Sequence, residues 1–267
     1  MSMLKIAVTG ASGRMGRAFM EYLSGREEVR ALAVSLPHSR SGRKSIEDEL
    51  AAQLDNVKLR YGLDVIVDFS SPEETLAAAS WAAARKTAMV IGTTGFTMAQ
   101  LNRLSDILQD VPVLLSPNMS MMMNLALRMT SNAVTVLPSD SVDVEIIERH
   151  HREKRNAPSS TALSLAQIVA EKRGWSLSEA LRREARWGLI GPRPEKEIAI
   201  SSIRGGSLNS EHTVIFATSG ESLEITHRSQ TLEPFARGAL RAAGWIIKQP
   251  PGVYDMLDML GLSEVLY

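Results

Sequence analysis

The feature that most constrains this chain is a short apolar run followed at once by evenly spaced glycines. Lys5 to Val8 is β-rich, the glycines stand at positions 10, 13 and 16, and apolar residues recur at helical spacing from Arg14 to Leu23. In this context glycine lets the turn close, and the free N–H groups of the helix start favour an anion. The sequence therefore predicts a dinucleotide-binding loop, formed by Gly10, Ala11, Ser12, Gly13, Arg14, Met15 and Gly16. A plain glycine-rich turn from strand to helix is the alternative.

As far as Asn118, short β-rich runs alternate with helical stretches long enough to serve as crossover connections. This order is typical of a parallel α/β sheet. Two of the expected helices run from Arg14 to Leu23 and from Pro72 to Arg85. The expected strands are Lys5 to Val8, Val29 to Val34, Val65 to Phe69, Ala88 to Ile91 and Val113 to Leu115.

Beyond Asn118 the order changes to helix, strand, helix and then three strands, separated by turn signals. The three strands are expected at Glu197 to Arg204, Glu211 to Thr218 and Glu221 to His227. We therefore predict an α/β protein with two domains. A Rossmann-type dinucleotide-binding domain spans 1–120 and is joined by the C-terminal 232–267, which opens with a helix from Leu232 to Lys248. A substrate-binding and oligomerisation domain with a mixed or antiparallel sheet spans 121–231, and the open face of its sheet is a candidate subunit interface.

Bulk composition excludes several other classes of function. The 267 residues include 30 basic and 30 acidic side chains, so no net field of one sign attracts nucleic acid or an anionic membrane. Cysteine is absent, which excludes disulfides, thiolate nucleophiles and Cys-based zinc sites. No run approaches the roughly 18 apolar residues of a membrane span, and the start lacks a signal-peptide pattern. We expect a cytoplasmic protein with no nucleic-acid or membrane partner.

The end of the second expected strand bears on the choice of cofactor. An acidic residue there would bind the ribose hydroxyls of NAD, but Ser35 follows the strand instead. Arg40, Arg43 or Lys44 could meet a 2′-phosphate, which favours NADP(H). An ordinary solvated loop explains the same cations, so the sequence predicts NADPH or NADH.

A segment rich in reactive side chains follows the strand predicted from Val142 to Arg149. An imidazole donates a proton near neutral pH, and a lysine binds or polarises an anionic substrate. Hydroxyls and backbone donors at a helix start suit a carboxylate. The segment therefore indicates an anion site with an acid beside it, built from His150, His151, Lys154, Ser159, Ser160 and Thr161. Metal ligation by the paired histidines lacks a third ligand at a supporting spacing, and Ser159 to Thr161 could serve only as a helix N-cap.

Motifs along nearly the whole chain resemble the dihydrodipicolinate reductase family, whose members are also called 4-hydroxy-tetrahydrodipicolinate reductases. The matching segments are GASGRMG at 10–16, DFSSP at 68–72, VIGTTG at 90–95, ERHHREK at 148–154, APS at 157–159, EHT at 211–213 and GVYDM at 252–256. Together they are far more specific than the glycine loop alone.

The resemblance implies a reductase of the diaminopimelate and lysine pathway that reduces a cyclic dicarboxylate with NADPH or NADH. His150 would be the proton donor and Lys154 its partner, while His151, Ser159, Ser160 and Thr161 would surround the substrate carboxylates. The nicotinamide side of the cofactor would meet Gly92, Thr93, Thr94, Ser116, Pro117, Asn118 and Met119. The resemblance also implies a homotetramer joined through the sheet of the second domain.

Several matched positions depart from the family pattern, and three of them bear on the substrate. Ser160 stands where the family has glycine in DAPSGT, Met122 replaces a glycine, and Leu232 replaces an arginine. Losing an arginine removes a bidentate clamp for a carboxylate. Arg228 or Arg193 is a candidate for compensation.

Three hypotheses follow from these residues. The first is the lysine-pathway reductase itself, with the departures tolerated or compensated. The second is a diverged relative that reduces another cyclic imine, enamine or unsaturated acid. The third is a protein that binds a nicotinamide nucleotide without turnover, against which the retention of His150 and Lys154 argues.

Overall fold

The computed structural model describes residues 3–34, 45–183 and 186–263, which divide into two compact units. The first unit comprises Met1–Met121 and Leu232–Tyr267, and the second comprises Met122–Thr231. Within the described ranges, no helix is long and apolar enough to span a membrane. Ser35, Arg40, Arg43 and Lys44 lie outside these ranges, so the inference about a 2′-phosphate stays a prediction.

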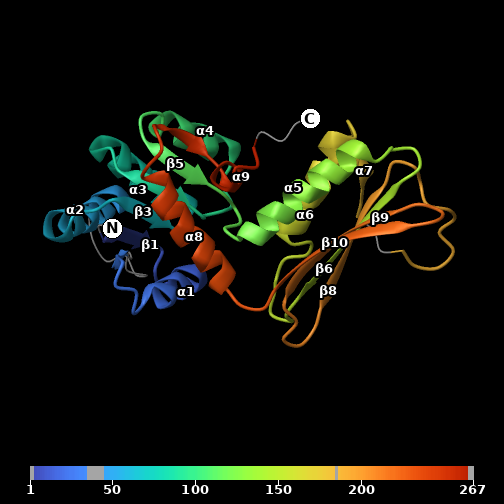
Figure 1. Cartoon of the computed structure of the whole chain (residues 1–267), viewed down its shortest axis with the longest axis horizontal. Coiled ribbons are helices and arrows are strands. Elements are labelled where there is room, and N and C mark those ends of the chain that lie inside the picture. The colour runs from blue at the N-terminus through green and yellow to red at the C-terminus, as the bar shows by residue number, and fades with distance from the viewer. Residues whose placement is uncertain (1–2, 35–44, 184–185, 264–267) are drawn as a thin grey trace. The chain divides into compact units, whose positions relative to one another are not determined.

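A parallel sheet of six strands forms the centre of the first unit (Figure 1). Its strand order is β11-β5-β4-β3-β1-β2, and every pair of neighbours is parallel. The strands are β1 (Leu4–Thr9), β2 (Val29–Val34), β3 (Val65–Asp68), β4 (Ala88–Ile91), β5 (Pro112–Leu115) and β11 (Gly252–Tyr254). The predicted Rossmann-type sheet is confirmed, and β11, only three residues long, is an addition that the sequence pattern did not indicate.

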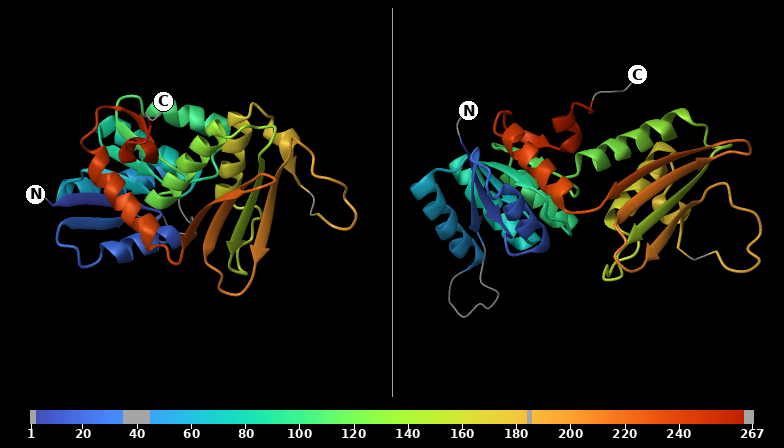
Figure 2. Two further views of the ribbon diagram at one scale, coloured as in Figure 1. Left: turned by 45° about the vertical axis from the view of Figure 1, so that its right-hand side comes forward. Right: turned by 60° about the horizontal axis from the view of Figure 1, so that its bottom comes forward.

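Helices cover both faces of this sheet. The helices are α1 (Arg14–Leu23), α2 (Ile46–Tyr61), α3 (Pro72–Arg85), α4 (Met98–Ile107), α8 (Glu233–Ile246) and α9 (Met256–Leu260). One apolar core joins α1, α8 and α9 to Ile6, Val8 and Val67, and a second joins α2, α3 and α4 to Ala7 and Ile66. Successive strand residues thus serve opposite faces of the sheet. The two views in Figure 2 show the sheet of the first unit with its helices. The helix α8 packs against α1 and the sheet of the first unit.

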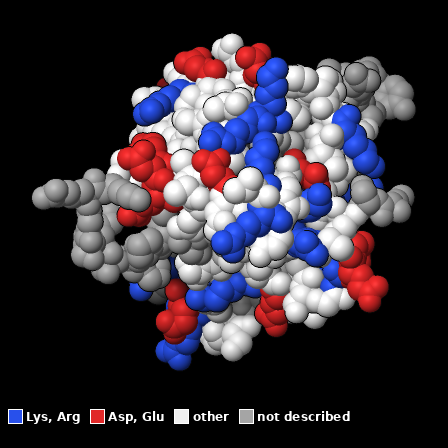
Figure 3. Space-filling model, turned by 90° about the vertical axis from the view of Figure 1, so that its left-hand side faces the viewer, with Lys and Arg blue, Asp and Glu red and all other residues white. Residues whose placement is uncertain are grey.

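On the face of the molecule shown in Figure 3, basic and acidic side chains are interspersed. That mixture accords with the balanced composition of 30 basic and 30 acidic residues. A surface of this kind gives no broad field of one sign on that face.

The second unit is a mixed sheet of five strands in the order β10-β9-β6-β8-β7, backed by helices. Its elements are α5 (Met121–Val136), β6 (Asp143–His150), α6 (Ser160–Lys172), α7 (Leu177–Ala180), β7 (Leu181–Arg182), β8 (Ile198–Arg204), β9 (Ser210–Ala217) and β10 (Ser222–Ser229). The pairing of β6 is parallel to β8 and antiparallel to β9, which confirms a mixed sheet.

Alternation along β6 determines which side chains reach the core. Val144 and Ile146 are buried against α5 and α6, whereas Asp143 and Arg149 are exposed on the opposite, open face. The same alternation continues to the end of the strand and places Glu148 and His150 on the core-facing side. A charged pair therefore stands at the end of an apolar stripe.

Candidate functional site

The glycine loop joins β1 to α1 at the carboxyl edge of the first sheet. Gly10 has φ +66°, and a Cβ there would overlap the carbonyl oxygen of Phe69. A Cβ on Gly16 would overlap the carbonyl oxygen of Gly10. The loop therefore folds tightly enough only with glycine at both positions.

The start of α1 differs from the starts of its neighbours α3 and α4. Ser71 and Thr97 cap those two helices through their side chains, whereas Gly13 caps α1 with no side-chain hydrogen bond. Backbone donors at the start of α1 are thus left without a side-chain acceptor at the point where a pyrophosphate would bind. The loop fits a dinucleotide.

Asp68, the last residue of β3, organises this edge of the sheet. It is fully buried, and four hydroxyl groups donate to its carboxylate. Thr9 and Ser70 donate to Oδ1 at 2.5 Å each, and Thr75 and Thr93 donate to Oδ2 at 2.5 and 2.6 Å. This set of side chains, the Asp68 hub, ties the end of β1, the start of α3 and the loop after β4 to one point.

Two further segments predicted to meet the cofactor follow β4 and β5 at the same edge. Thr93 is buried and directed to Asp68, while Thr94 is exposed. The Ser116 hydroxyl donates to the carbonyl oxygen of Asn118 at 3.0 Å, which folds the segment after β5 into a tight turn. The structure thus gathers the glycine loop, residues 92–94 and residues 116–119 at the carboxyl ends of neighbouring parallel strands, where α/β folds bind nucleotides.

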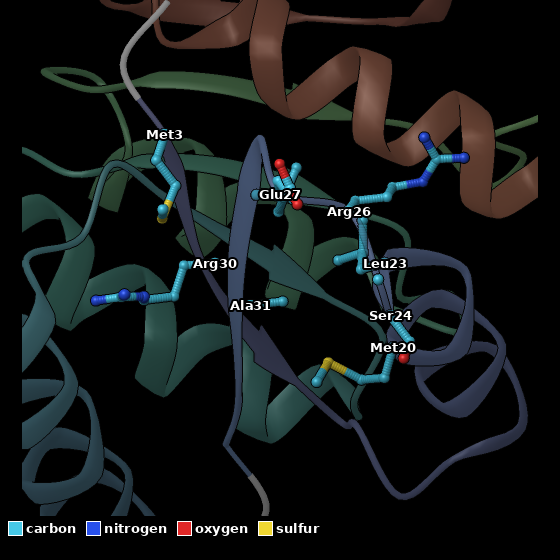
Figure 4. A pocket seen from close by; sticks show the side chains of 10 residues that line it. Met3, Met20, Leu23, Ser24, Arg26, Glu27, Arg30 and Ala31 are labelled. Atoms are coloured by element: carbon cyan, nitrogen blue, oxygen red, sulfur yellow. The ribbon is translucent and has the colours of Figure 1, made fainter.

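An open pocket of about 660 Å³ in the first unit lies elsewhere (Figure 4). Met20 and Leu23 from the end of α1 line it together with Arg30 and Ala31 from β2. It adjoins the start of β2, away from the carboxyl edge that carries the glycine loop, so its position does not match the nucleotide site.

Glu148 is the centre of a polar cluster in the second unit. Arg204 donates to both carboxylate oxygens, at 2.8 and 2.6 Å. The Nδ1 of His150 lies 2.5 Å from Oε2, and the backbone N–H of Ser159 donates to Oε1 at 3.2 Å. Burial alone would raise the pKa of Glu148, but hydrogen bonds from Arg204, Ser202 and His150 outweigh it and lower the pKa to about 2. Glu148 is therefore ionised at neutral pH.

His150 and His212 lie edge to face inside the same cluster, with ring centroids 5.2 Å apart. Burial lowers the pKa of His150, the hydrogen bond to Glu148 opposes that effect, and the charges of Lys154 and Arg204 add to it. Burial, with the nearby His150, lowers the pKa of His212 to about 3, so His212 is neutral. Its Nε2 lies 2.8 Å from the Ser159 hydroxyl.

The remaining residues predicted to bind substrate lie on the segment between β6 and α6. Ser159 is the N-cap of α6 and accepts from the Ala162 N–H at 3.1 Å, so the capping role considered for it is confirmed. Ser160 is exposed in the first turn of α6. His151 and Lys154 are half-buried on the loop that leaves β6, and the Lys154 N–H donates to the His151 carbonyl at 3.1 Å.

The Ser210 hydroxyl, 3.1 Å from Nε2 of His150, completes the cluster. The sequence analysis assigned no role to four of its members, Glu148, Arg204, Ser210 and His212. Glu148 carried a usable signal, because it continues the core-facing alternation of Val144 and Ile146 with a charge. The other three lie on β8 and β9, more than 50 positions from Glu148 or the residues it contacts. Strand register brings them in: Glu148 pairs with His212, and His150 pairs with Arg204.

The suggested compensation by Arg228 or Arg193 is wrong. The Nε of Arg228 donates to Glu211 at 2.7 Å on the open face of the sheet. Arg193 donates to Glu145 at 3.0 Å and to Asp143 at 2.8 Å, both of which also point away from the core-facing side that carries His150. Both guanidinium groups are committed to carboxylates on the opposite face.

Comparison with known proteins identifies the family of the chain. Residues 4–119 match the family model described as dihydrodipicolinate reductase, N-terminus, and residues 122–260 match the model described as dihydrodipicolinate reductase, C-terminus. The chain belongs to the dihydrodipicolinate reductase family. The resemblance read from the motifs is thereby confirmed.

Relatives in this family align with nearly the whole chain. The 4-hydroxy-tetrahydrodipicolinate reductase of Anaeromyxobacter dehalogenans is 42% identical, over 97% of this chain and 98% of the relative. The enzyme of the same name from Syntrophus aciditrophicus is 41% identical, over 98% of this chain and 100% of the relative. The similarity to these relatives thus extends over both of the units described above.

Solved structures support the same fold. A dipicolinate-bound dihydrodipicolinate reductase from Paenisporosarcina sp. TG-14 superposes with a TM-score of 0.73 at 24% identity, covering 96% of this chain and 98% of that one. The two-unit architecture is therefore that of a dihydrodipicolinate reductase, an NAD(P)H-dependent oxidoreductase fold.

Proposed function

We propose that the chain reduces 4-hydroxy-tetrahydrodipicolinate, or the dihydrodipicolinate derived from it, to tetrahydrodipicolinate in the diaminopimelate and lysine pathway. The observation that carries this proposal is a buried imidazole, His150, held by an ionised carboxylate, Glu148, on the strand that leads into the predicted substrate segment. That arrangement suits a general acid, and family membership supplies the substrate class.

The first unit holds NADPH or NADH, which supplies a hydride when bound. Gly10 to Gly16 would carry the pyrophosphate at the start of α1, because that helix alone of α1, α3 and α4 lacks a side-chain cap. Residues 92–94 and 116–119 would face the nicotinamide. Within the first of these segments, Thr93 is held in place by its hydrogen bond to Asp68. The domain roles assigned to 1–120 with 232–267 and to 121–231 are part of this proposal.

The second unit binds the cyclic dicarboxylate and protonates it. His151, Lys154, Ser160 and Thr161 would surround the carboxylates at the start of α6, where backbone N–H groups favour an anion. Ser159 would act mainly through its neighbours, since its hydroxyl is bonded to His212 and its N–H to Glu148. Hydride addition at one ring carbon then leaves the neighbouring carbon to take the proton of His150.

The decisive experiment is a coupled assay in which a synthase makes the substrate from pyruvate and aspartate semialdehyde. Oxidation of NADPH or NADH by the purified chain is expected. Replacing His150 with glutamine should lower turnover by about 10²-fold or more and leave nucleotide affinity unchanged, because His150 acts in the substrate unit. Inactivity of the wild-type chain with both nucleotides, despite nucleotide binding, would favour a different cyclic substrate or a binding protein without turnover.

We also propose a cytoplasmic homotetramer joined through the open face of the second sheet. Ile147, Ile203 and Ile215 lie on that face, on three adjacent strands. Burying them in a subunit interface would remove apolar area from water. Sedimentation equilibrium should give the mass of four chains, and a monomer would contradict this part of the proposal.

A further inference from the structure

The two ring nitrogens of His150 have different partners, and this determines which one exchanges its proton. Nδ1 lies 2.5 Å from Oε2 of Glu148. An ionised carboxylate only accepts hydrogen bonds, so the hydrogen in this contact belongs to Nδ1. Two bonds from Arg204 occupy the same carboxylate and weaken its ability to take that hydrogen. The proton that His150 gains and loses is therefore on Nε2.

Nε2 faces the hydroxyl of Ser210, with 3.1 Å between the two atoms. Ser210 is the first residue of β9 and directly follows an exposed turn that includes Ser207 and Asn209. His150 is only 7% exposed, whereas Ser210 is half-buried. The hydroxyl thus lies between a buried imidazole nitrogen and the solvent, and a hydroxyl both donates and accepts.

We propose that Ser210 is a positioning residue that orients Nε2 of His150 and returns a solvent proton to it after each turnover. This inference rests on the proposed function. In the chemical step the N–H bond at Nε2 breaks as a C–H bond forms on the substrate, which leaves neutral imidazole with its hydrogen on Nδ1. Ser210 then donates its hydroxyl hydrogen to Nε2 and takes a hydrogen from water at the turn, so each turnover consumes one solvent proton.

The charged and titratable groups around His150 come from several elements. Glu148 shares β6, Arg204 is on β8, His212 is on β9 and Lys154 is on the loop after β6. Of these, Glu148 is bonded to Nδ1, while His212 uses its Nε2 on Ser159 rather than on His150. Ser210 places a hydroxyl within hydrogen-bond distance of the exchanging nitrogen.

The test compares Ser210→Ala with Ser210→Thr, which keeps the hydroxyl, and with Ser207→Ala, which alters an exposed hydroxyl in the same turn. We expect Ser210→Ala to lower kcat about tenfold, the effect of one net hydrogen bond, with the KM for the nucleotide unchanged. The alkaline limb of its pH profile, where the general acid His150 loses its proton, should shift, and its solvent isotope effect should rise. The kcat of Ser210→Thr should stay within about threefold of the wild-type value, and the kcat of Ser207→Ala should equal the wild-type value.

A measurement without substrate separates this inference from the proposed function. Nitrogen-15 NMR of the free chain should show His150 with its hydrogen on Nδ1 when neutral, and Ser210→Ala should change the shift of Nε2. An active wild type with an equally active Ser210→Ala variant, or a hydrogen on Nε2 in neutral His150, would overturn the inference. An inactive wild type that still shows the Nδ1 tautomer and the Nε2 response to Ser210→Ala would overturn the proposed function alone.

Discussion

Each unit contains a fully buried carboxylate, and the two are stabilised in different ways. Four hydroxyl groups, from Thr9, Ser70, Thr75 and Thr93, donate to Asp68 in the first unit. Glu148 in the second unit instead receives two bonds from the Arg204 guanidinium and one from an imidazole, besides bonds from a backbone N–H and from the Ser202 hydroxyl. Both carboxylates are satisfied, but only the second is hydrogen-bonded to an imidazole.

This difference corresponds to two tasks. The hydroxyl groups bonded to Asp68 are neutral and do not titrate near neutral pH. The Asp68 hub therefore has a structural task, which is to hold the surrounding loops in fixed positions relative to one another. The Glu148 cluster fixes a tautomer and so determines which nitrogen of His150 carries the exchanging proton. Removing either carboxylate should therefore damage a different property of the enzyme.

The largest effect is expected for Glu148→Gln. Loss of the charge leaves Arg204 without its anion and removes the constraint on Nδ1 of His150. We expect a loss of about 3 kcal/mol in the free energy of unfolding, typical of a broken buried ion pair, and a fall in kcat of about 10²-fold or more. Urea denaturation and the coupled assay measure the two effects.

The matched control is Glu28→Gln, which breaks a pair with Arg26 in which the Arg26 and Glu28 side chains are 36% and 65% exposed. Such pairs contribute about 1 kcal/mol or less. If Glu148→Gln behaved like Glu28→Gln in both assays, the assignment of separate tasks to the two carboxylates would be wrong.

A smaller and different effect is expected for Asp68→Ala. Without the carboxylate, Thr93 and Thr9 lose the common acceptor that holds their loops at the nucleotide edge. Leaving buried hydroxyls unsatisfied costs about 1 to 3 kcal/mol of unfolding free energy, and we expect nucleotide affinity to fall about tenfold. Isothermal titration with NADPH and NADH measures the second effect.

Two further variants make this prediction sharper. Asp68→Asn keeps the size and lets the hydroxyls reorient around an amide, so it should retain most of the nucleotide affinity. Asp64→Ala removes a carboxylate that accepts from the Lys5 N–H just before β3, at the opposite end of the same strand. Nucleotide affinity should be unchanged in Asp64→Ala, and an equal loss in both alanine variants would contradict a specific role for Asp68.

The sequence predicted the elements that carry a strong periodic pattern or clear end signals. The bounds of α1 and α3 were predicted to the residue, because apolar spacing and Pro72 mark them, and β6 was found from its alternation. Four short elements, α7, β7, β11 and α9, were not predicted, because so few residues show no period. The four-residue strands β3, β4 and β5 were predicted, because their residues are nearly all apolar.

For the site, the sequence identified residues close to one another along the chain and missed those joined by register. His150 and Ser159 lie in one segment whose chemistry can be read directly. Ser210 and His212 reach the same cluster only because β9 pairs antiparallel with β6, and one shift of register would turn both side chains to the open face. Asp68 and Ser70 share the DFSSP motif, whereas Thr9 and Thr93 reach the same carboxylate from distant segments of the chain.

The smallest expected effect concerns acid stability and depends on His212. Its pKa is about 3 in the folded chain and about 6.5 when unfolded, so the unfolded state binds more protons between those values. The contribution of neutral His212 to the free energy of unfolding is therefore fully present above pH 6.5, and it is lost as the pH falls toward 3. The corresponding loss for Glu148 begins only below about pH 4.5 and extends toward pH 2, which separates the two contributions.

Urea denaturation at pH 7.5 and pH 5.0 isolates the histidine contribution. We expect His212→Asn to cost about 1 kcal/mol at pH 7.5, where its bond to Ser159 is disturbed. Between pH 6.5 and 5.0 the wild type loses up to about 2 kcal/mol that the variant does not lose, so the difference should vanish or reverse. His151→Asn, on the loop beyond the cluster, should run parallel to the wild type at both pH values. The difference in unfolding free energy between wild type and His212→Asn could instead be the same at both pH values. His212 would then bind no extra proton on unfolding, and the Glu148 cluster would differ from the Asp68 hub only in its hydrogen-bond partners.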